Sequence, residues 1–94
     1  MAARHPQEHR EEQQFIHLVR LAWDLHERGM RASVELPVGG EPVLLVSPSL
    51  PLFSTRVMAV RRGRDWWFTW GRDAKQSVPA LAPHAADLIR EVAQ

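Results

Sequence analysis

Apolar residues in the first third of the chain recur with the period of an α-helix. Between residues 8 and 28 they follow the i, i+3, i+4, i+7 spacing of one helix face, and Ile16 and Trp23 widen that face. The stripe consists of Phe15, Leu18, Val19, Ala22, Leu25 and His26. Glutamates in the first turns suit the helix dipole, and Gly29 is a favourable residue just after a helix end. We therefore expect a helix over residues 8–28, held to the rest of the fold by Leu18, Val19, Ala22 and Leu25.

The middle of the chain changes to the pattern of β-strands. Residues 31–36 alternate between apolar and polar side chains, which is typical of a strand with one buried face. Three further strands are expected at 43–47, 55–62 and 65–71, separated by segments rich in proline, glycine and serine. Residues 72–78 are polar and predict a loop.

A last helix is expected near the C-terminus, with Pro83 in its first turn. Its apolar stripe consists of Ala85, Leu88, Ile89 and Val92. The order helix, four strands, helix predicts an α+β fold: a four-stranded antiparallel meander with both helices on one face of the sheet. Ninety-four residues make one domain, which we place at 8–94. Residues 1–7 lack apolar periodicity and predict a flexible tail.

The third and fourth strands predict a tight hairpin. Gly63 and Arg64 form a two-residue loop with glycine at its first central position, which is typical of a type II′ turn. The expected pairs are Arg61 with Trp66, Val60 with Trp67, Ala59 with Phe68, Met58 with Thr69 and Val57 with Trp70. Large aromatic side chains on one face then lie opposite small ones, as suits a core. A three-residue loop would shift the register by one and exchange the two faces.

The other face of this hairpin combines an apolar centre with an arginine rim. Such an arrangement is typical of binding surfaces, and an apolar patch left uncovered usually marks an interface. The candidate interface residues are Arg56, Met58, Val60, Arg62, Trp67 and Thr69. The alternative interpretation is that the tryptophans are all core residues and the arginines a solvated rim, since aromatic side chains at strand spacing usually pack inside.

Charge adds a second functional interpretation. The net charge is +1, but residues 54–76 hold six basic side chains against two acidic ones, a local excess of four. Eleven of the twelve cationic residues are arginine, which favours stacked or bidentate contacts. Beside tryptophan, these arginines could form a platform for nucleic-acid bases and phosphates. The sequence pI of 8.6 falls short of the strongly basic range of nucleic-acid-binding domains, so this function ranks second.

No residue pattern indicates an enzyme. The chain has no cysteine, which excludes disulfides, zinc–thiolate sites and thiol catalysis. It has no nucleophile elbow, phosphate-binding loop or dinucleotide fingerprint. His5 and His9 have the spacing of a metal-binding pair, but Pro6 lies between them and no third ligand is near in sequence. We expect no catalytic residue, no metal and no cofactor.

The progression ERGMRASVELPVGGEPVLLVSPSLP, then RRGRDWWFTWGR and a short C-terminal helix, resembles a group of small actinobacterial proteins. In that group a leading helix ends in glycine, a strand ends near proline, and a Trp-Trp-Phe-x-Trp strand follows. The resemblance covers residues 15–93 and implies a fold pattern and a bacterial cytoplasmic setting, but no activity. Gly71 to Asp73 follow the last tryptophan directly, where the group has a longer ending, so the end of the fourth strand stays open.

These patterns predict a non-enzymatic protein-interaction or regulatory module that uses the exposed face of its sheet. It is expected to act as a homodimer or as a small partner of a larger protein. The alternative is a nucleic-acid-binding accessory protein that uses the arginine–tryptophan hairpin. The N-terminus has no apolar signal core and the apolar runs are too short to cross a bilayer, so a cytoplasmic protein without a membrane role is expected.

Overall fold

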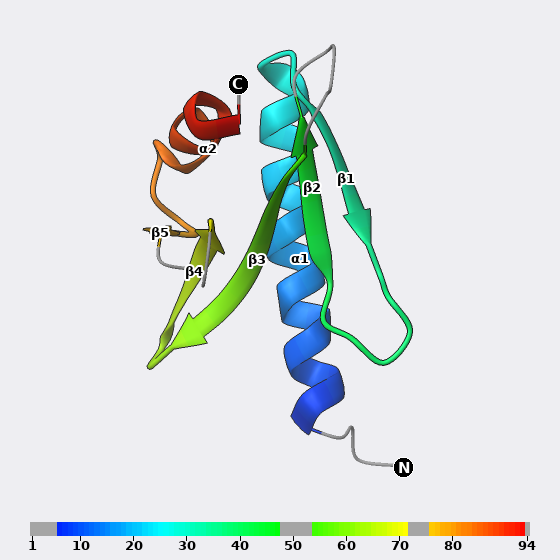
Figure 1. Cartoon of the computed structure of the whole chain (residues 1–94). Helices are drawn as coiled ribbons and strands as arrows, with labels where there is room; N and C mark the ends of the chain where they lie inside the picture. The colour runs from blue at the N-terminus through cyan, green and yellow to red at the C-terminus, as the bar shows by residue number, and fades with distance from the viewer. Residues whose placement is uncertain (1–5, 48–53, 72–75, 94) are drawn as a thin grey trace.

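The described part of the chain consists of five consecutive strands between an N-terminal and a C-terminal helix. The computed structural model describes residues 6–47, 54–71 and 76–93. The elements are α1 (Pro6–Glu27), β1 (Arg31–Glu35), β2 (Val43–Ser47), β3 (Thr55–Arg62), β4 (Asp65–Trp70), β5 (Gln76–Pro79) and α2 (Ala85–Ala93) (Figure 1). The strands form one antiparallel sheet in the order β1-β2-β3-β4-β5, a simple meander. The α+β class and the element order are thus confirmed, apart from one additional strand.

That additional strand, β5, corrects the prediction of four strands and the prediction of a loop at 76–78. Residues 72–75 of the expected loop lie outside the described residues. Phe68 of β4 pairs with Val78, and Trp70 pairs with Gln76. The indole Nε1 of Trp70 also donates a 2.6 Å hydrogen bond to Oε1 of Gln76. Four residues with only one buried apolar side chain, Val78, give too little periodicity to identify a strand from sequence. Proline at the end of β5 is compatible with an edge strand.

Element boundaries differ slightly from those expected. The first helix begins at Pro6, a residue whose fixed φ suits a first helical position, so Pro6 and Gln7 belong to α1 rather than to a tail. Residues 1–5 of the expected tail lie outside the described residues. The first strand ends at Glu35 and the fourth at Trp70, each one residue earlier than expected. At the fourth strand the chain leaves the sheet at Gly71, which has a φ of 84°.

The buried side of α1 is rotated relative to the prediction. The helical side chains in the core are Leu18, Leu21, Ala22 and Leu25. Val19, expected in the core, is 42% exposed, and Phe15 and His26 are exposed as well. Apolar residues occupy two adjacent sides of this helix, so the spacing alone did not decide which side packs. The burial of Leu21 shows which side packs, because Leu21 lies next to Leu18 and Leu25 on the side of the helix that is turned away from Val19.

The core lies between the two helices and one face of the sheet. Both helices contribute to a single buried cluster with side chains that share that face of β2, β3, β4 and β5. The sheet members of this cluster are Leu44, Val46, Val57, Ala59, Phe68, Trp70 and Val78. In α2 the buried residues are Ala85, Ala86, Ile89 and Ala93, whereas Leu88 is half-buried and Val92 is exposed. This correction to the α2 stripe leaves Ile89 as its central core residue.

The β3–β4 hairpin has the predicted register. Met58 pairs with Thr69, Ala59 with Phe68, Val60 with Trp67 and Arg61 with Trp66. Gly63 has a φ of 64°, the positive value that the first central position of such a turn requires. The aromatic face that was expected to form core does so, with Trp66 partly buried against it.

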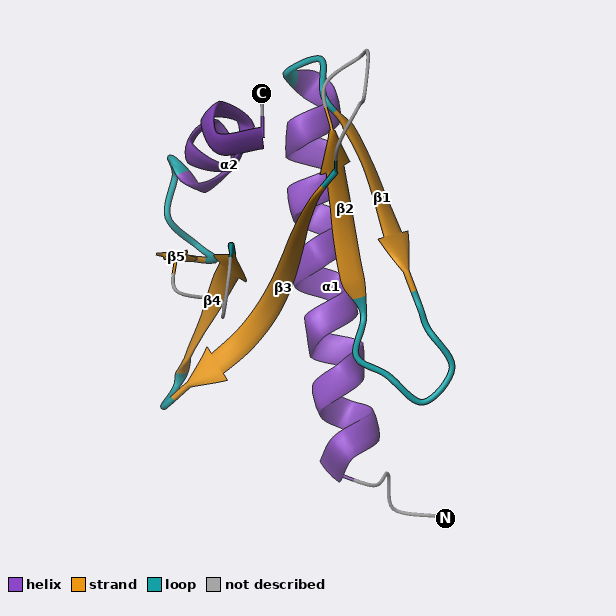
Figure 2. Cartoon of the chain, in the orientation of Figure 1, coloured by secondary structure: helices purple, strands orange, loops and turns teal. Residues whose placement is uncertain are grey.

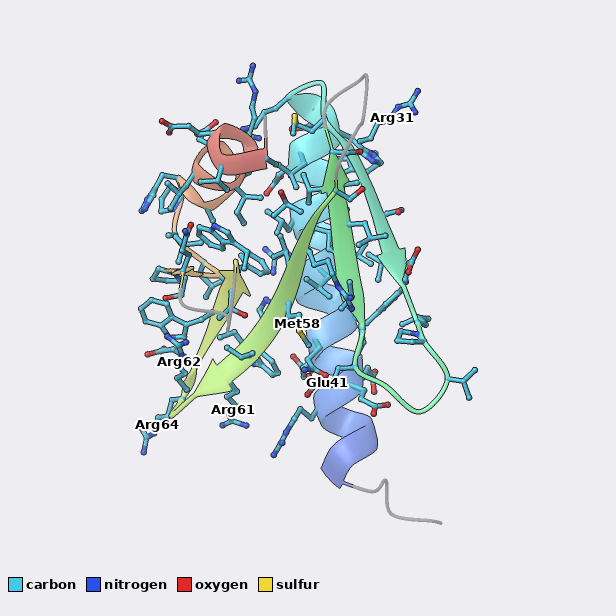
Figure 3. All side chains as sticks on the ribbon, viewed as in Figure 1. Arg31, Glu41, Met58, Arg61, Arg62 and Arg64 are labelled. Atoms are coloured by element: carbon cyan, nitrogen blue, oxygen red, sulfur yellow. The ribbon has the colours of Figure 1, made fainter. Side chains whose placement is uncertain are left out.

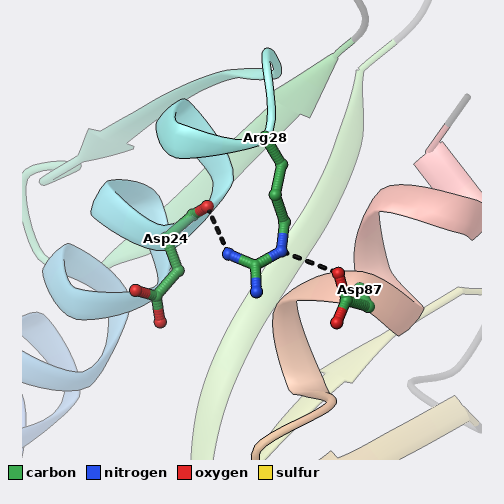
Figure 4. A network of polar contacts seen from close by, with 3 residues as sticks. All are labelled: Asp24, Arg28 and Asp87. Atoms are coloured by element: carbon green, nitrogen blue, oxygen red, sulfur yellow. Dashed lines mark hydrogen bonds and ion pairs between the residues drawn. The ribbon is translucent and has the colours of Figure 1, made fainter.

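Polar contacts also join α1 to the rest of the fold. Buried Gln14 donates from Nε2 to the Ala59 carbonyl of β3 (3.0 Å) and to Oε1 of Glu41 (3.3 Å). At the other end of α1, Arg28 bridges to α2 (Figure 4). Its Nε donates to Asp87 at 2.7 Å and its Nη1 to the Asp24 carbonyl at 2.8 Å. The hydrogen bond from Arg28 lowers the pKa of Asp87 below its ordinary value.

Truncation of α1 side chains tests which side of the helix packs. Leu18→Ala and Leu25→Ala should each lower the free energy of unfolding by about 2–5 kcal/mol, because both side chains are fully buried. Val19→Ala, on the exposed side, is the matched control and should change it by no more than about 0.5 kcal/mol. Urea denaturation of the three variants provides the measurement. Equal losses for Val19→Ala and Leu18→Ala would contradict the observed orientation of α1.

Candidate interaction surfaces

The sheet has one face that no described helix covers. In Figures 1 and 2, β2 and β3 pass in front of α1, and this uncovered face is turned toward the viewer. Strand alternation and the ladder pairings place the side chains that lie on it. Its apolar members are Val43, Leu45, Met58, Val60 and Trp67. We call it the open face.

The structure brings the predicted interface residues together on the open face, but with unequal exposure. Arg56 and Arg62 are exposed, as expected of a rim. Met58, Val60 and Trp67 are half-buried, and Val60 lies directly opposite Trp67 in the ladder. Thr69 is only 2% exposed and therefore offers almost no surface to a partner. The accessible part of the predicted site consists of the other five residues.

Arg62 covers part of Trp67. Its guanidinium carbon lies 5.6 Å from the centroid of the Trp67 ring, a cation–π distance. Its Nη1 is also 3.4 Å from Oγ of Ser77 in β5. A ligand that approaches Trp67 therefore meets a guanidinium as well as the indole. Any base that stacks on that side of the ring must displace Arg62.

Three arginines gather where β3 turns into β4. Arg61, Arg62 and Arg64 lie at this end of the hairpin in Figure 3. Arg61 donates from Nε to the Gly63 carbonyl at 3.0 Å, which holds its side chain beside the turn. Asp65 is the ladder partner of Arg62. The hairpin end is thus a compact basic site next to the open face.

A second apolar surface lies on α1 and was not predicted as a surface. Trp23 is 67% exposed, and three other large apolar side chains on the same side of the helix are each about two-fifths exposed. The four residues, which we call the α1 stripe, are Phe15, Ile16, Val19 and Trp23. The sequence signal for this surface was present, because α1 has more apolar residues than one buried side can accommodate.

Contacts on either side of α1 show where the α1 stripe faces. On one side, the His17 ring lies 5.2 Å from the Trp66 ring, and Arg28 meets Asp87 of α2. On the side of the α1 stripe, His26 Nε2 lies 2.9 Å from the Ala32 carbonyl of β1. A carbonyl oxygen only accepts, so Nε2 carries the proton in this contact. The α1 stripe therefore flanks β1, the first edge strand of the sheet.

A shallow pocket lies between α1 and the β5–α2 connection. It has a volume of about 200 Å³, and its charged or titratable lining residues are His17, Arg20 and Asp24. Burial lowers the pKa of His17 below its ordinary value, and the positive charge of Arg20 lowers it further. The lining contains no serine, threonine or lysine nucleophile. Within the described parts of the chain, no group of three histidine, aspartate or glutamate residues could hold a metal ion.

Comparisons with known proteins do not add to this description. No family model, no curated protein and no solved structure matches the chain. In the described residues, no helix has the length and apolar character needed to span a bilayer.

The lowered pKa of His17 predicts a loss of stability in mild acid. The unfolded chain binds a proton at the ordinary histidine pKa of 6.5, whereas folded His17 resists protonation, so stability declines as the pH falls below that value. The melting temperature should therefore fall less between about pH 7.5 and about pH 5.5 in His17→Gln than in the wild type. Arg20→Gln removes only the smaller cause and should give an intermediate fall. Superimposable pH profiles of wild type and His17→Gln would show that His17 does not contribute.

Proposed function

We propose that this protein is a non-enzymatic interaction module that binds a segment of another protein on its open face. The observation that carries the proposal is the position of Trp67. This large aromatic residue lies with Val60 and Met58 at the centre of a sheet face that no described helix covers. Tryptophan and arginine are among the residue types that dominate the binding energy at protein interfaces, and such residues cluster near the centre of the interface.

The rim indicates the chemistry of the partner. Arg56 and Arg62 are exposed on either side of the apolar centre, and Arg62 is already held over Trp67. A guanidinium can remain stacked on a ring while its N–H edge binds a carboxylate. We therefore propose that the segment has apolar side chains in its middle and aspartate or glutamate near its ends. Opposite charges at the rim would favour association and fix the orientation of the segment.

The half-buried state of the apolar centre supports binding rather than simple core packing. Met58, Val60 and Trp67 each retain accessible surface, whereas their neighbours on the opposite face, Ala59 and Phe68, retain almost none. A bound segment would remove this remaining apolar surface from water, which stabilises the complex. The bacterial cytoplasmic setting implied by the resemblance remains part of the proposal.

A second candidate function, nucleic-acid binding, follows from the arginine cluster. Arg61, Arg62 and Arg64 could neutralise phosphates at the hairpin end (Figure 3). The position of Arg62 over Trp67 counts against base stacking on that side of the ring. Binding that weakens steeply with added salt and shows no dependence on Trp67 would support this function instead.

Peptide binding by Trp67→Ala tests the proposed function. The probes are short labelled peptides that share one apolar centre and carry either glutamate or lysine at both ends, with a labelled single-stranded DNA of mixed sequence as the third probe. The wild type should prefer the glutamate peptide in fluorescence anisotropy. Trp67→Ala should weaken that binding by about 2 kcal/mol, roughly 30-fold, because it removes the central aromatic contact.

Two further variants complete this experiment. Arg56→Glu combined with Arg62→Glu should reverse the preference toward the lysine peptide, because the rim charge is inverted. Trp23→Ala, on α1, is the matched tryptophan control and should leave peptide binding unchanged. Equal binding of both peptides, or a Trp67→Ala protein that no longer folds, would contradict a binding role for the open face.

A further inference from the structure

We infer that a second copy of this chain covers the α1 stripe and the free edge of β1, forming a symmetric dimer in which the two β1 strands pair antiparallel. This dimer uses the edge of β1 and the outer side of α1, not the apolar centre of the open face around Trp67, so the inference does not depend on the proposed function. Three features support it. One side of α1 is apolar and exposed, the outer edge of β1 beside it has no neighbouring strand among the described residues, and β1 carries charges that would pair with the opposite charges of a second copy.

The α1 stripe exposes an apolar area comparable to the largest apolar patch of a typical soluble protein. With aromatic side chains of roughly 150–250 Å² each, the four residues leave on the order of 400 Å² accessible. A patch of this size is at the level that marks interaction sites on soluble proteins. Trp23 contributes most, because two-thirds of it is exposed. Tryptophan is also one of the residue types enriched among dominant interface contacts.

The edge of β1 continues this surface. Ala32 and Val34 point to the same side of the sheet as α1 and are only partly buried, and Leu36, next on that side, is 64% exposed. A stable dimer buries roughly 800 Å² on each partner. The α1 stripe provides about half of that area, and the strand edge with Leu36 can provide much of the rest. The apolar surface is thus large enough for a stable dimer only if the second copy covers both the α1 stripe and the edge of β1.

Of the two sheet edges, β1 is the one suited to pairing. It lies at the end of the strand order, so its outer side has no neighbouring strand among the described residues. It has five residues and no proline. At the opposite edge, β5 has four residues and includes Pro79, which cannot donate a backbone hydrogen bond. A free edge of this kind is a template for another strand.

Charge on β1 selects a second copy as the partner, in an antiparallel orientation. Arg31 and Glu35 occupy the two ends of the strand on one face, with Ser33 midway between them. Antiparallel pairing about Ser33 places Arg31 opposite Glu35 of the second copy, and the two-fold axis repeats this contact. Parallel pairing would instead bring like charges together, which is destabilising. A self-complementary patch is what a two-fold symmetric interface requires.

The same two-fold axis brings the helices together. The contact of His26 with Ala32 sets the level of α1 against β1. With rises of about 1.5 Å per helical residue and about 3.3 Å per strand residue, Ser33 lies level with the helix near Trp23. The most exposed residue of the α1 stripe is therefore closest to the symmetry axis. The two α1 helices then lie on one side of a continuous sheet and run antiparallel to each other, because the axis that reverses β1 also reverses α1. Within each copy α1 and β1 run in opposite directions (Figure 1).

His26 does not prevent this pairing. Its Nε2 uses one lone pair of the Ala32 carbonyl, and a carbonyl oxygen has a second that can accept from a strand of the other copy. His26 also packs on the same side of α1 as the α1 stripe. It therefore becomes part of the contact between the two copies.

Analytical ultracentrifugation over a wide concentration range tests the dimer. The wild type should sediment at twice the chain mass of 10.8 kDa. Trp23→Ala should weaken association by roughly 30-fold while circular dichroism stays unchanged, since this side chain is mostly exposed in the single chain. Trp67→Ala, on the open face, is the matched control and should leave the dimer intact.

Charge variants on β1 provide a second and sharper test. Arg31→Glu and Glu35→Arg should each weaken self-association by about tenfold or more, because like charges then face each other across the axis. The double variant with both changes restores opposite charges and should dimerise like the wild type. An equimolar mixture of the two single variants should form a heterodimer, in which both charge contacts are again favourable.

Three results would overturn the inference. A wild-type protein that is monomeric at the highest concentration would leave the α1 stripe to a different partner. A dimer that Trp67→Ala dissociates and Trp23→Ala does not would place the contact on the open face. Single charge variants that associate as tightly as the wild type, with no preference for the heterodimer, would exclude pairing through β1.

Discussion

The packing of α1 against one face of the sheet is the constraint on which the other features of this molecule depend. Leu18 and Leu25 are fully buried against strand residues such as Val46 and Val57. The second helix, α2, has only nine residues and extends the same layer, joined to α1 by the contact of Arg28 with Asp87. Both helices therefore pack on the same face of the sheet. Apolar side chains that lie elsewhere, on the open face or on the outer side of α1, have no described helix to cover them.

The sequence was most informative where local chemistry permits one geometry. Gly63 allows a two-residue turn, and that turn determines every pair in the β3–β4 ladder, so register and core face could be predicted together. The α1 face was harder because the helix has apolar residues on two adjacent sides. Spacing cannot rank two apolar sides, since the choice depends on the shape of the sheet that the helix covers. The prediction therefore placed Val19 in the core and omitted Leu21, whereas in the structure Leu21 is buried and Val19 is exposed.

Strand β5 and Thr69 illustrate a second limit of sequence patterns. The four residues of β5 form a strand because β4 presents a complete ladder beside them, not because of their own propensity. Thr69 alternates correctly to the open face, yet it is buried between Met58 of β3 and Ser77 of β5, its ladder partners. Alternation predicts the side of the sheet on which a residue lies. How much of that residue stays accessible depends on its neighbours across the strands.

The two apolar surfaces have a geometric relation that gives the proposed dimer a functional consequence. Pairing of β1 with its copy joins the two sheets edge to edge, with all four helices on one side. Both open faces then lie on the opposite side of a single continuous sheet. A partner with two suitable segments could occupy both faces at once, and the second contact would form at the high effective concentration set by the first. Modest affinity at each half-buried centre around Trp67 would then be sufficient for stable binding of such a partner.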